Sequence, residues 1–533
     1  METNWWRNRI VYQVLLPSFF DSNRDGTGDI QGIIDKLEYL DYLGVDAIWL
    51  SPVFSSPMHD LGYDVSDYRS VNPVFGSMAD LKCLISESHR WGIRIILDMV
   101  INHTSISHPW FVESRSSLTN HKRDWYIWKD GRGKQPPNNW KSVYTGSAWE
   151  FDQHSGQYYY HTFFRQQPDL NWRNPDVQAE FMDILRFWLD AGIDGFRLDA
   201  INMIIKAGNI DESRSLPAQL LNRENFVTRN QPESIDIVAK IRALVDGYGD
   251  RLIVGEIYTL PPGHPATVAR YLSGQKEMLH MAFDFSMIFR RWAALPVSRA
   301  VEKWMLHIPP GSWPCHVLSN HDLHRSLHSG WWRKRTNEKA KIQAMLLLTL
   351  KGTPFLYYGE EIGMRNTRIP RSSIRDPLGK KFWPLYSGRD KSRTPMQWTN
   401  GKYAGFSEVT PWLPVNKDFI FRNVESSLED GESVLQFYRR LIRFRRSSNA
   451  LLSGQWNPLI PSGRNVMAYL RVSEEEILLI LLNFSGRVAR PGFLISGTLQ
   501  VLLSTHRDAS NKIGLSQLKL FPYEATIFKI SSE

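Results

Sequence analysis

Short apolar runs alternate with amphipathic helical patterns over most of the chain. The eight runs with the composition of β-strands begin at Ile10, Ala47, Ile93, Gly195, Leu252, Met281, His316 and Pro354. The clearest helical pattern follows Asn174, a good N-cap residue, with Pro175 in the first turn and apolar side chains at helical spacing from Val177 to Trp188. Alternating β and α elements form parallel sheets, and eight such units favour a closed barrel over an open sheet. The pattern therefore predicts an α/β fold, a (β/α)8 TIM barrel.

The spacing of these runs also divides the chain into domains. About a hundred residues separate the starts of the third and fourth runs, whereas the other gaps are under sixty residues. We therefore expect an inserted subdomain at 104–171, a stretch rich in Trp, Tyr, Gly and Pro. Beyond 453, short alternating strands follow one another without helices, which predicts a C-terminal β-sandwich at 454–533. The barrel then comprises 1–103 and 172–453.

The composition is that of a soluble globular protein. Of 533 residues, 42% are hydrophobic and 22% are charged. The net charge is +9, but the densest basic stretch, from Arg439, alternates with Leu and Phe as a solvated helix face does. The two cysteines, Cys83 and Cys315, give no disulfide framework. METNWWRNRI is not a signal peptide and no apolar run is long enough to cross a bilayer, so we expect a cytoplasmic protein without membrane or nucleic-acid partners.

The fourth predicted strand, GFRLDA, carries charges where an ordinary core strand would not. Side chains alternate along a strand, so Arg197 and Asp199 share one face while Phe196 and Leu198 share the other. An unpaired buried charge costs several kcal/mol. By itself, this stretch fits a structural ion pair and a functional site equally well.

Polar residues also end three other predicted strands. They are Asp98, Asn102 and His103 after the third strand, Glu256 after the fifth, and Asn320, His321 and Asp322 after the seventh. Active sites of TIM barrels lie at these carboxyl ends, so four such strands indicate a site. Its carboxylates suit either glycoside hydrolysis or a divalent-metal enzyme with Asp and Glu ligands. Twenty tryptophans favour a sugar, and no Gly-rich phosphate cradle is present.

Several ordered motifs resemble one known family. VYQVLLPSFFDSNRDGTGD, DMVINH, GFRLDA, GEI and SNHD resemble the α-amylase clan, glycoside hydrolase family 13. HDLGYDVSDY, QPDLNW and GRDKSRTPMQW are similar to its α-glucosidase and oligo-1,6-glucosidase branch. The resemblance implies a retaining mechanism with Asp199 as nucleophile, Glu256 as general acid/base and Asp322 as the stabiliser of the transition state. Arg197 would keep Asp199 ionised and oriented.

The same resemblance implies a set of substrate-binding residues around one terminal glucose. His103 and His321 would bind its hydroxyls, Tyr63 would stack on it, and a pair formed by Asp60 and Arg393 would close the pocket at the non-reducing end. Phe163 and Gln167 also match subsite positions of the family. A small oligosaccharide is therefore the expected partner, no catalytic cofactor is expected, and the chain would act as a monomer or homodimer.

DSNRDGTGD near the start of the chain has the chemistry of a calcium loop. Oxygen-bearing side chains recur at alternating positions, and Gly26 permits a sharp turn. Unlike an EF-hand, the loop lacks a Glu at the twelfth position and does not follow a helix. A capped polar turn is the alternative, but the resemblance implies a structural Ca2+ or Mg2+. Its ligands would be Asp21, Asn23, Asp25, Thr27 through its carbonyl, and Asp29.

The linkage preference is predicted from one position. In the family, the residue after the nucleophile tends to be Val in isomaltose-cleaving members and smaller or polar in maltose-cleaving ones, and here it is Ala200. We therefore expect an exo-acting α-glucosidase with an α-1,4 preference. The alternatives are an α-1,6-glucosidase, a glucosyltransferase or a sucrose- or trehalose-converting enzyme. A non-catalytic protein of this fold, like transporter heavy chains, would lack the carboxylates and carry a membrane span.

Overall fold

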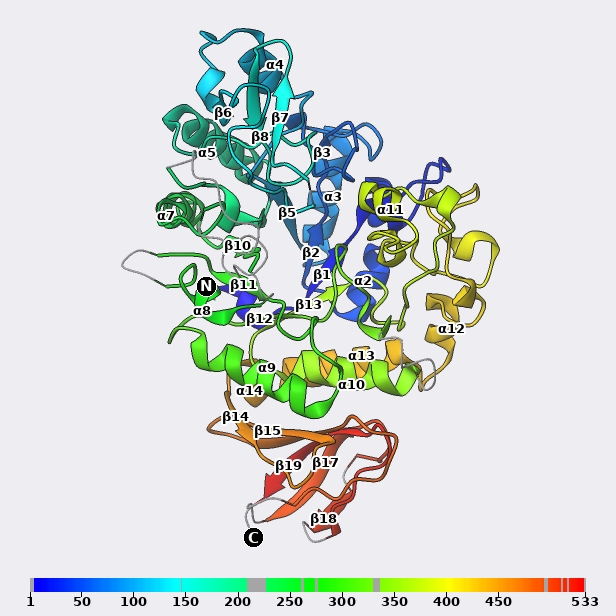
Figure 1. Cartoon of the computed structure of the whole chain (residues 1–533). Helices are drawn as coiled ribbons and strands as arrows, with labels where there is room; N and C mark the ends of the chain where they lie inside the picture. The colour runs from blue at the N-terminus through cyan, green and yellow to red at the C-terminus, as the bar shows by residue number, and fades with distance from the viewer. Residues whose placement is uncertain are drawn as a thin grey trace.

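A closed barrel of eight parallel strands forms the centre of the protein (Figure 1). The computed structural model describes residues 4–144, 146–208, 227–259, 263–273, 277–328, 336–492, 497–509, 511–514 and 517–531. The barrel strands are β1 (Val11–Val14), β2 (Ala47–Leu50), β5 (Arg94–Val100), β9 (Gly195–Asp199), β10 (Leu252–Gly255), β11 (Met281–Asp284), β12 (Cys315–Val317) and β13 (Thr353–Tyr357). They neighbour one another in sequence order, and β13 closes the barrel against β1. The predicted TIM barrel is confirmed, strand by strand.

Helices surround this barrel. They are α1 (Ile30–Ile34), α2 (Leu37–Leu43), α3 (Met78–Arg90), α5 (Pro175–Asp190), α7 (Glu233–Asp246), α8 (Pro265–Ala269), α9 (Ala294–His307), α10 (Thr336–Thr349) and α13 (Val434–Ser447). The helix predicted after Asn174 is α5, and the Asn174 side chain accepts the backbone N–H of Asp176 as its N-cap. Its buried stripe, which includes Phe181 and Trp188, packs in the main hydrophobic core.

Between β5 and α5 the chain forms a small subdomain at one end of the barrel (Figure 1). It contains α4 (Pro109–Ser116) and a three-stranded antiparallel sheet of β6 (Trp128–Lys129), β7 (Trp149–Asp152) and β8 (Gln157–Tyr160). Trp140, Trp149, Tyr158 and Tyr160 are buried together in a cluster of their own. Many aromatic residues of this segment therefore serve packing.

The C-terminal domain is all-β, as predicted. Its strands are β14 (Gln455–Leu459), β15 (Val466–Val472), β16 (Ile477–Asn483), β17 (Thr498–Ser504), β18 (Lys512–Gly514) and β19 (Ala525–Ser531). Where a two-sheet sandwich was expected, these strands are joined in a single antiparallel sheet. Alternate residues of β16 explain the arrangement: Leu478 and Ile480 pack in the main hydrophobic core on the side of the helices, whereas Leu479 packs with Leu520 on the other face. The helices of the barrel thus cover the face that a second sheet would cover.

Helix α13 contains the basic stretch noted in the sequence. Arg440, Arg443 and Arg446 are exposed, as expected for a solvated face. Arg445 is the exception, because it is buried and donates to the carbonyls of Leu348 (2.7 Å) and Gly352 (2.7 Å). In the described part of the chain, no helix has the length and apolar character that crossing a membrane requires.

Candidate active site

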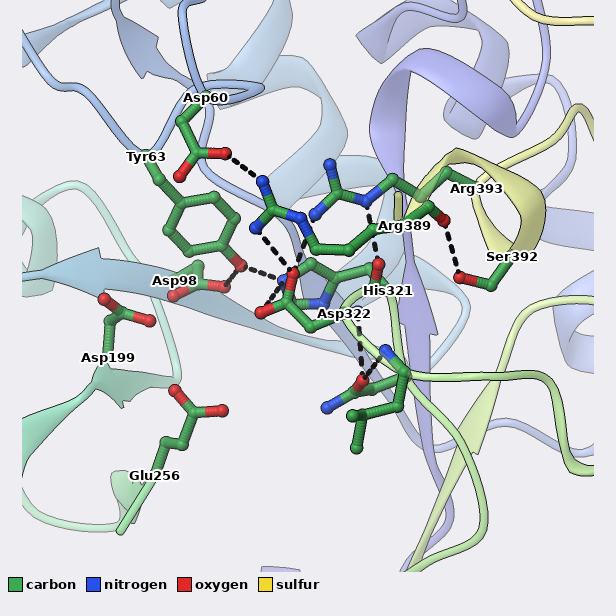
Figure 2. A network of polar contacts seen from close by, with 12 residues as sticks. Asp60, Tyr63, Asp98, Asp199, Glu256, His321, Asp322, Arg389, Ser392 and Arg393 are labelled. Carbon is green, nitrogen blue, oxygen red and sulfur yellow. Dashed lines mark hydrogen bonds and ion pairs between the residues drawn. The ribbon is translucent and has the colours of Figure 1, made fainter. Parts of the chain in front are cut away.

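Most of the predicted site residues line one pocket of about 260 Å³ at the carboxyl ends of the barrel strands. The lining includes Asp60, Tyr63, His103, Phe163, Gln167, Asp199, Glu256 and Asp322. The other three, Arg197, His321 and Arg393, lie behind this wall and hold lining residues in place. Residues spread over more than two hundred positions of the sequence therefore meet at one mouth (Figure 2).

Arg197 is the centre of the site, with 1% of its surface exposed. The parallel register of β5 and β9 sets Asp98 beside Arg197, and Nη1 donates to Asp98 Oδ1 and to Asp199 Oδ1, each at 2.6 Å. Its other terminal nitrogen, Nη2, lies 2.7 Å from Glu256 Oε2. A single guanidinium thus contacts three carboxylates, and the charged face of GFRLDA belongs to a functional cluster.

Burial changes the acidity of these carboxyl groups. It raises the pKa of Asp199 and of Glu256 to about 7 each, although the charge of Arg197 opposes both shifts. It also raises the pKa of Asp98 to about 6, but Asp98 Oδ2 accepts further hydrogen bonds from Trp49 (3.2 Å) and Tyr63 (2.8 Å). One cation does not balance three buried carboxylates, so the cluster as a whole retains a proton near neutral pH. The site can therefore hold a proton donor and an anion side by side, as acid/base catalysis next to a nucleophile requires.

Asp322 has the opposite character. Burial would raise its pKa, but its neighbours His321, Arg389 and Arg393 hold that pKa well below its usual range. Its Oδ1 accepts from Arg393 Nη2 at 2.7 Å and from Arg389 Nη1 at 3.2 Å. Asp322 is therefore a permanently ionised group facing the pocket, suited to stabilising positive charge.

Tyr63 lies beside these carboxylates and contacts two histidines, of which His103 lines the pocket and His321 lies behind it. The phenol oxygen of Tyr63 lies 2.6 Å from His321 Nε2, and the two rings are parallel with centroids 5.3 Å apart. His103 Nε2 lies 3.0 Å from the carbonyl oxygen of Tyr63. Gln167 Nε2 contacts Asp60 Oδ2 at 3.3 Å, and the Phe163 ring packs against His103.

The predicted pair of Asp60 and Arg393 is wrong in its second member. Asp60 Oδ1 pairs with Nη2 of Arg389 at 2.6 Å, whereas Arg393 binds Asp322 and the carbonyl of His321 (2.8 Å) (Figure 2). Both arginines belong to the GRDKSR motif, and the short helical turn η7 (Asp390–Ser392) separates them. The motif brings two arginines to the site, but its spacing alone does not show which one reaches Asp60.

Arg389 and a group of aromatic residues are the site residues that the sequence did not reveal. Arg389 also binds Asp376 (2.9 Å) and donates to the hydroxyl of Tyr144 (3.2 Å) in the inserted subdomain. The pocket is further lined by Tyr144, Tyr258, Phe285, Phe289, Leu378 and Tyr386. The aromatic composition indicated a sugar site but could not identify these residues, because the five aromatic ones lie on irregular connections and Leu378 lies on the short helix α11 (Pro377–Phe382).

The predicted calcium loop forms a tight turn before α1. Asp21 accepts the backbone N–H groups of Arg24 (2.8 Å) and Gly26 (2.8 Å), and Asp29 caps α1 by accepting from Gly32 (2.6 Å). Asp25 accepts from the N–H of Thr27 at 2.7 Å and from the Asn23 amide at 3.1 Å. Within the described ranges, no three acidic, His or Cys side chains converge closely enough to hold a metal. Carboxylate oxygens accept more than one partner, so the donor set still suits a hard cation, although its three carboxylates do not converge on one centre.

The sequence is similar to known enzymes over nearly its full length. Residues 13–454 match the α-amylase catalytic-domain family. The chain is 38% identical to an oligo-1,6-glucosidase of Parageobacillus thermoglucosidasius, over 99% of this chain and 100% of the relative. It is 39% identical to a probable α-glucosidase of Rhizobium meliloti, over 92% of this chain and 91% of the relative.

Solved structures show the same likeness. An isomaltulose synthase mutant from Erwinia rhapontici, in complex with its natural substrate sucrose, matches with a TM-score of 0.92 at 34% identity and covers 100% of both chains. The barrel, the carboxylate cluster at its mouth and these similarities together show that the chain belongs to the α-amylase family of glycoside hydrolases, family 13.

Proposed function

We propose that the protein is a retaining, exo-acting α-glucosidase that releases α-D-glucose from the non-reducing end of short α-glucosides. The observation that carries this proposal is the placement of Asp199 and Glu256 on the two terminal nitrogens of one buried guanidinium. Retaining glycosidases need their two carboxyl groups about 5 Å apart, whereas inverting enzymes need a wider gap for a water molecule. Short contacts to the same Arg197 support the closer arrangement.

In the proposed mechanism, an oxygen of Asp199 attacks C1 of the terminal glucose. Glu256 gives its proton to the glycosidic oxygen, the bond from C1 to that oxygen breaks, and a glucosyl ester of Asp199 forms. The Glu256 carboxylate then takes a proton from water, whose oxygen attacks C1 and releases Asp199. Asp322 stays ionised throughout and stabilises the oxocarbenium-like transition states. No catalytic cofactor is needed for either step.

The exo character follows from the closed end of the pocket. Asp60 and Arg389 form an ion pair whose side chains are each about 5% exposed, and Arg389 also reaches Asp376, Tyr144 and Asp322. A planar guanidinium that is held by several partners is rigid, so Arg389 and Asp60 close this end of the pocket. The closed end supports binding of one terminal glucose, with the rest of the substrate directed toward the open side of the pocket.

The α-1,4 preference rests on Ala200. This residue lines the pocket directly after Asp199 and has a left-handed backbone with φ of 44°, which β-branched residues disfavour. A small side chain leaves room for a maltose-type glucoside. The oligo-1,6-glucosidase relative favours α-1,6 cleavage as the second candidate, and the sucrose-bound isomaltulose synthase favours sucrose as a further donor.

Proton NMR of the purified protein with maltose tests this function. The glucose from the non-reducing end is expected as the α-anomer, because two inversions at C1 retain the configuration. The first spectra should therefore show more α-glucose than the anomeric mixture of the released reducing-end glucose supplies. Isomaltose and sucrose in parallel tubes give the linkage preference, and new disaccharide signals would show transfer. An excess of β-glucose over that mixture would contradict the retaining mechanism, and faster cleavage of isomaltose than of maltose would contradict the inference from Ala200.

We also propose that the turn of residues 21–29 binds a structural divalent cation, through the oxygens of Asp21, Asn23, Asp25, Thr27 and Asp29. An ion there would join the turn to the start of α1. Excess chelator is therefore expected to lower the melting temperature by several degrees, and added Ca2+ should restore it. Differential scanning calorimetry measures this, with Asp25→Asn as a variant that should respond less. An unchanged melting temperature in chelator would contradict the proposal.

A cytoplasmic location is also proposed. Both cysteines are free, Cys83 on the surface and Cys315 in the core, as is usual in reducing compartments.

A further inference from the structure

Two buried amide side chains stand behind the two histidines of the site. Gln13 Nε2 lies 2.7 Å from Nδ1 of His321, and Asn102 Nδ2 lies 3.2 Å from Nδ1 of His103. Gln13 is 2% exposed and Asn102 is fully buried, and neither is among the residues that line the pocket. Their effect on a bound sugar is therefore transmitted through the imidazoles.

The contacts of Asn102 determine the tautomer of His103. Lys206 Nζ, which can only donate, lies 2.9 Å from Asn102 Oδ1, and Asp169 Oδ2, which can only accept when ionised, lies 3.0 Å from Nδ2. The amide nitrogen therefore faces His103 and donates to its Nδ1. On the other side of the ring, Nε2 faces the carbonyl oxygen of Tyr63, which can only accept. His103 thus carries its proton on Nε2.

An independent set of contacts gives His321 the same tautomer. The hydroxyl of Tyr63 uses its single hydrogen on Asp98 Oδ2 at 2.8 Å, so its oxygen can only accept from His321 Nε2. Burial lowers the pKa of His321 to about 3, so the ring is neutral and its Nδ1 must be an acceptor. Gln13 supplies the matching donor.

Both imidazoles therefore donate an Nε2–H to the same residue, one to the hydroxyl of Tyr63 and one to its carbonyl. Figure 2 shows the hydroxyl of Tyr63 held between Asp98 and His321. We infer that Gln13 and Asn102 are positioning residues: they fix His321 and His103 as Nε2–H tautomers, so that both rings donate to Tyr63 and hold it in one orientation. This inference rests on the proposed function, in which Tyr63 stacks on the terminal glucose.

Gln13→Glu tests the inference, because it replaces the donor facing Nδ1 with an acceptor of nearly the same size. The Glu carboxylate can only accept, so Nδ1 of His321 must carry a proton to bond it. If Nε2 keeps its own proton for Tyr63, the ring becomes an imidazolium. The charged groups that face this ring are Asp322, Arg389, Arg393, Arg197 and, through Tyr63, Asp98. We expect kcat/KM to fall about tenfold and its pH profile to acquire a new alkaline limb as the imidazolium loses its proton.

The direct readout is 15N NMR of protein labelled at histidine. The wild type should show two buried, non-titrating Nε2–H imidazoles, and Gln13→Glu should convert one to a titrating imidazolium. Gln343→Glu is the matched control: Gln343 is 3% exposed on α10 and bonds Ser326, outside the pocket. It introduces the same charge, and should lower stability without changing the two signals or the pH profile.

Gln13→Met is a second test that does not depend on the folding of the Glu variant. It removes the donor to His321 Nδ1 without adding a carboxylate acceptor. It should lower kcat/KM without the new alkaline limb. An Nδ1–H signal from either histidine in the wild type, or an unchanged kcat/KM in Gln13→Met, would overturn the inference. If both tautomers are as expected but no glucoside is cleaved, the tautomer assignment is supported and the proposed function alone fails.

Discussion

Asp199→Asn is expected to reduce kcat on maltose by roughly four orders of magnitude. The amide oxygen can still accept the hydrogen bond that Arg197 Nη1 makes with Asp199 at 2.6 Å, so the pocket should keep its shape. The amide cannot form the glucosyl ester, however, and the nucleophilic step is lost. Binding of maltose, measured by calorimetry, should remain detectable while release of glucose falls to background.

Asp194→Asn provides the control on the same stretch of chain. Asp194 lies immediately before β9, is 3% exposed, and accepts from the backbone of Ile95 (2.9 Å) and contacts His89 (2.7 Å). Asp194 lies at the end of β9 that is far from the pocket. The Asp194→Asn substitution should therefore lower the melting temperature and leave kcat unchanged. Turnover by Asp199→Asn at more than a few per cent of the wild-type rate would refute the assignment of the nucleophile.

Arg389→Lys is expected to lower kcat/KM by about a hundredfold, the second largest effect. The guanidinium reaches Asp60, Asp376, Tyr144 and Asp322 at once, and a lysine ammonium cannot reproduce that planar fork. The loss should fall mainly on substrates that need the closed end of the pocket, and so on short α-glucosides. Steady-state kinetics with maltose and isomaltose measure it.

Double-mutant cycles distinguish Arg389 from Arg393. Combining Asp60→Asn with Arg389→Lys should give a strongly non-additive loss of kcat/KM, because these side chains are in contact at 2.6 Å. Combining Asp60→Asn with Arg393→Lys should give nearly additive losses, since Arg393 binds Asp322 instead. Stronger coupling of Asp60 to Arg393 would restore the pairing that the sequence motif suggested.

The fold was predictable because the strands of a barrel are buried on both faces. Such strands appear in a sequence as short apolar runs, and the observed strands begin within a residue or so of the predicted ones, as at Val11, Cys315 and Thr353. The C-terminal domain was less predictable. The apolar faces of β16 identify a buried strand, but they do not show that helices α9 and α10 would cover one face in place of a second sheet.

The sequence also determined which residues of the strands would enter the site. Alternation fixes the face of each side chain, and parallel strands end at one rim, so Asp98, Arg197, Asp199 and Glu256 had to meet. The tertiary structure alone decided the contacts made by connecting segments. Asp60 and Arg389 are 329 positions apart, and no local periodicity relates two residues whose contact depends on the paths of two separate loops.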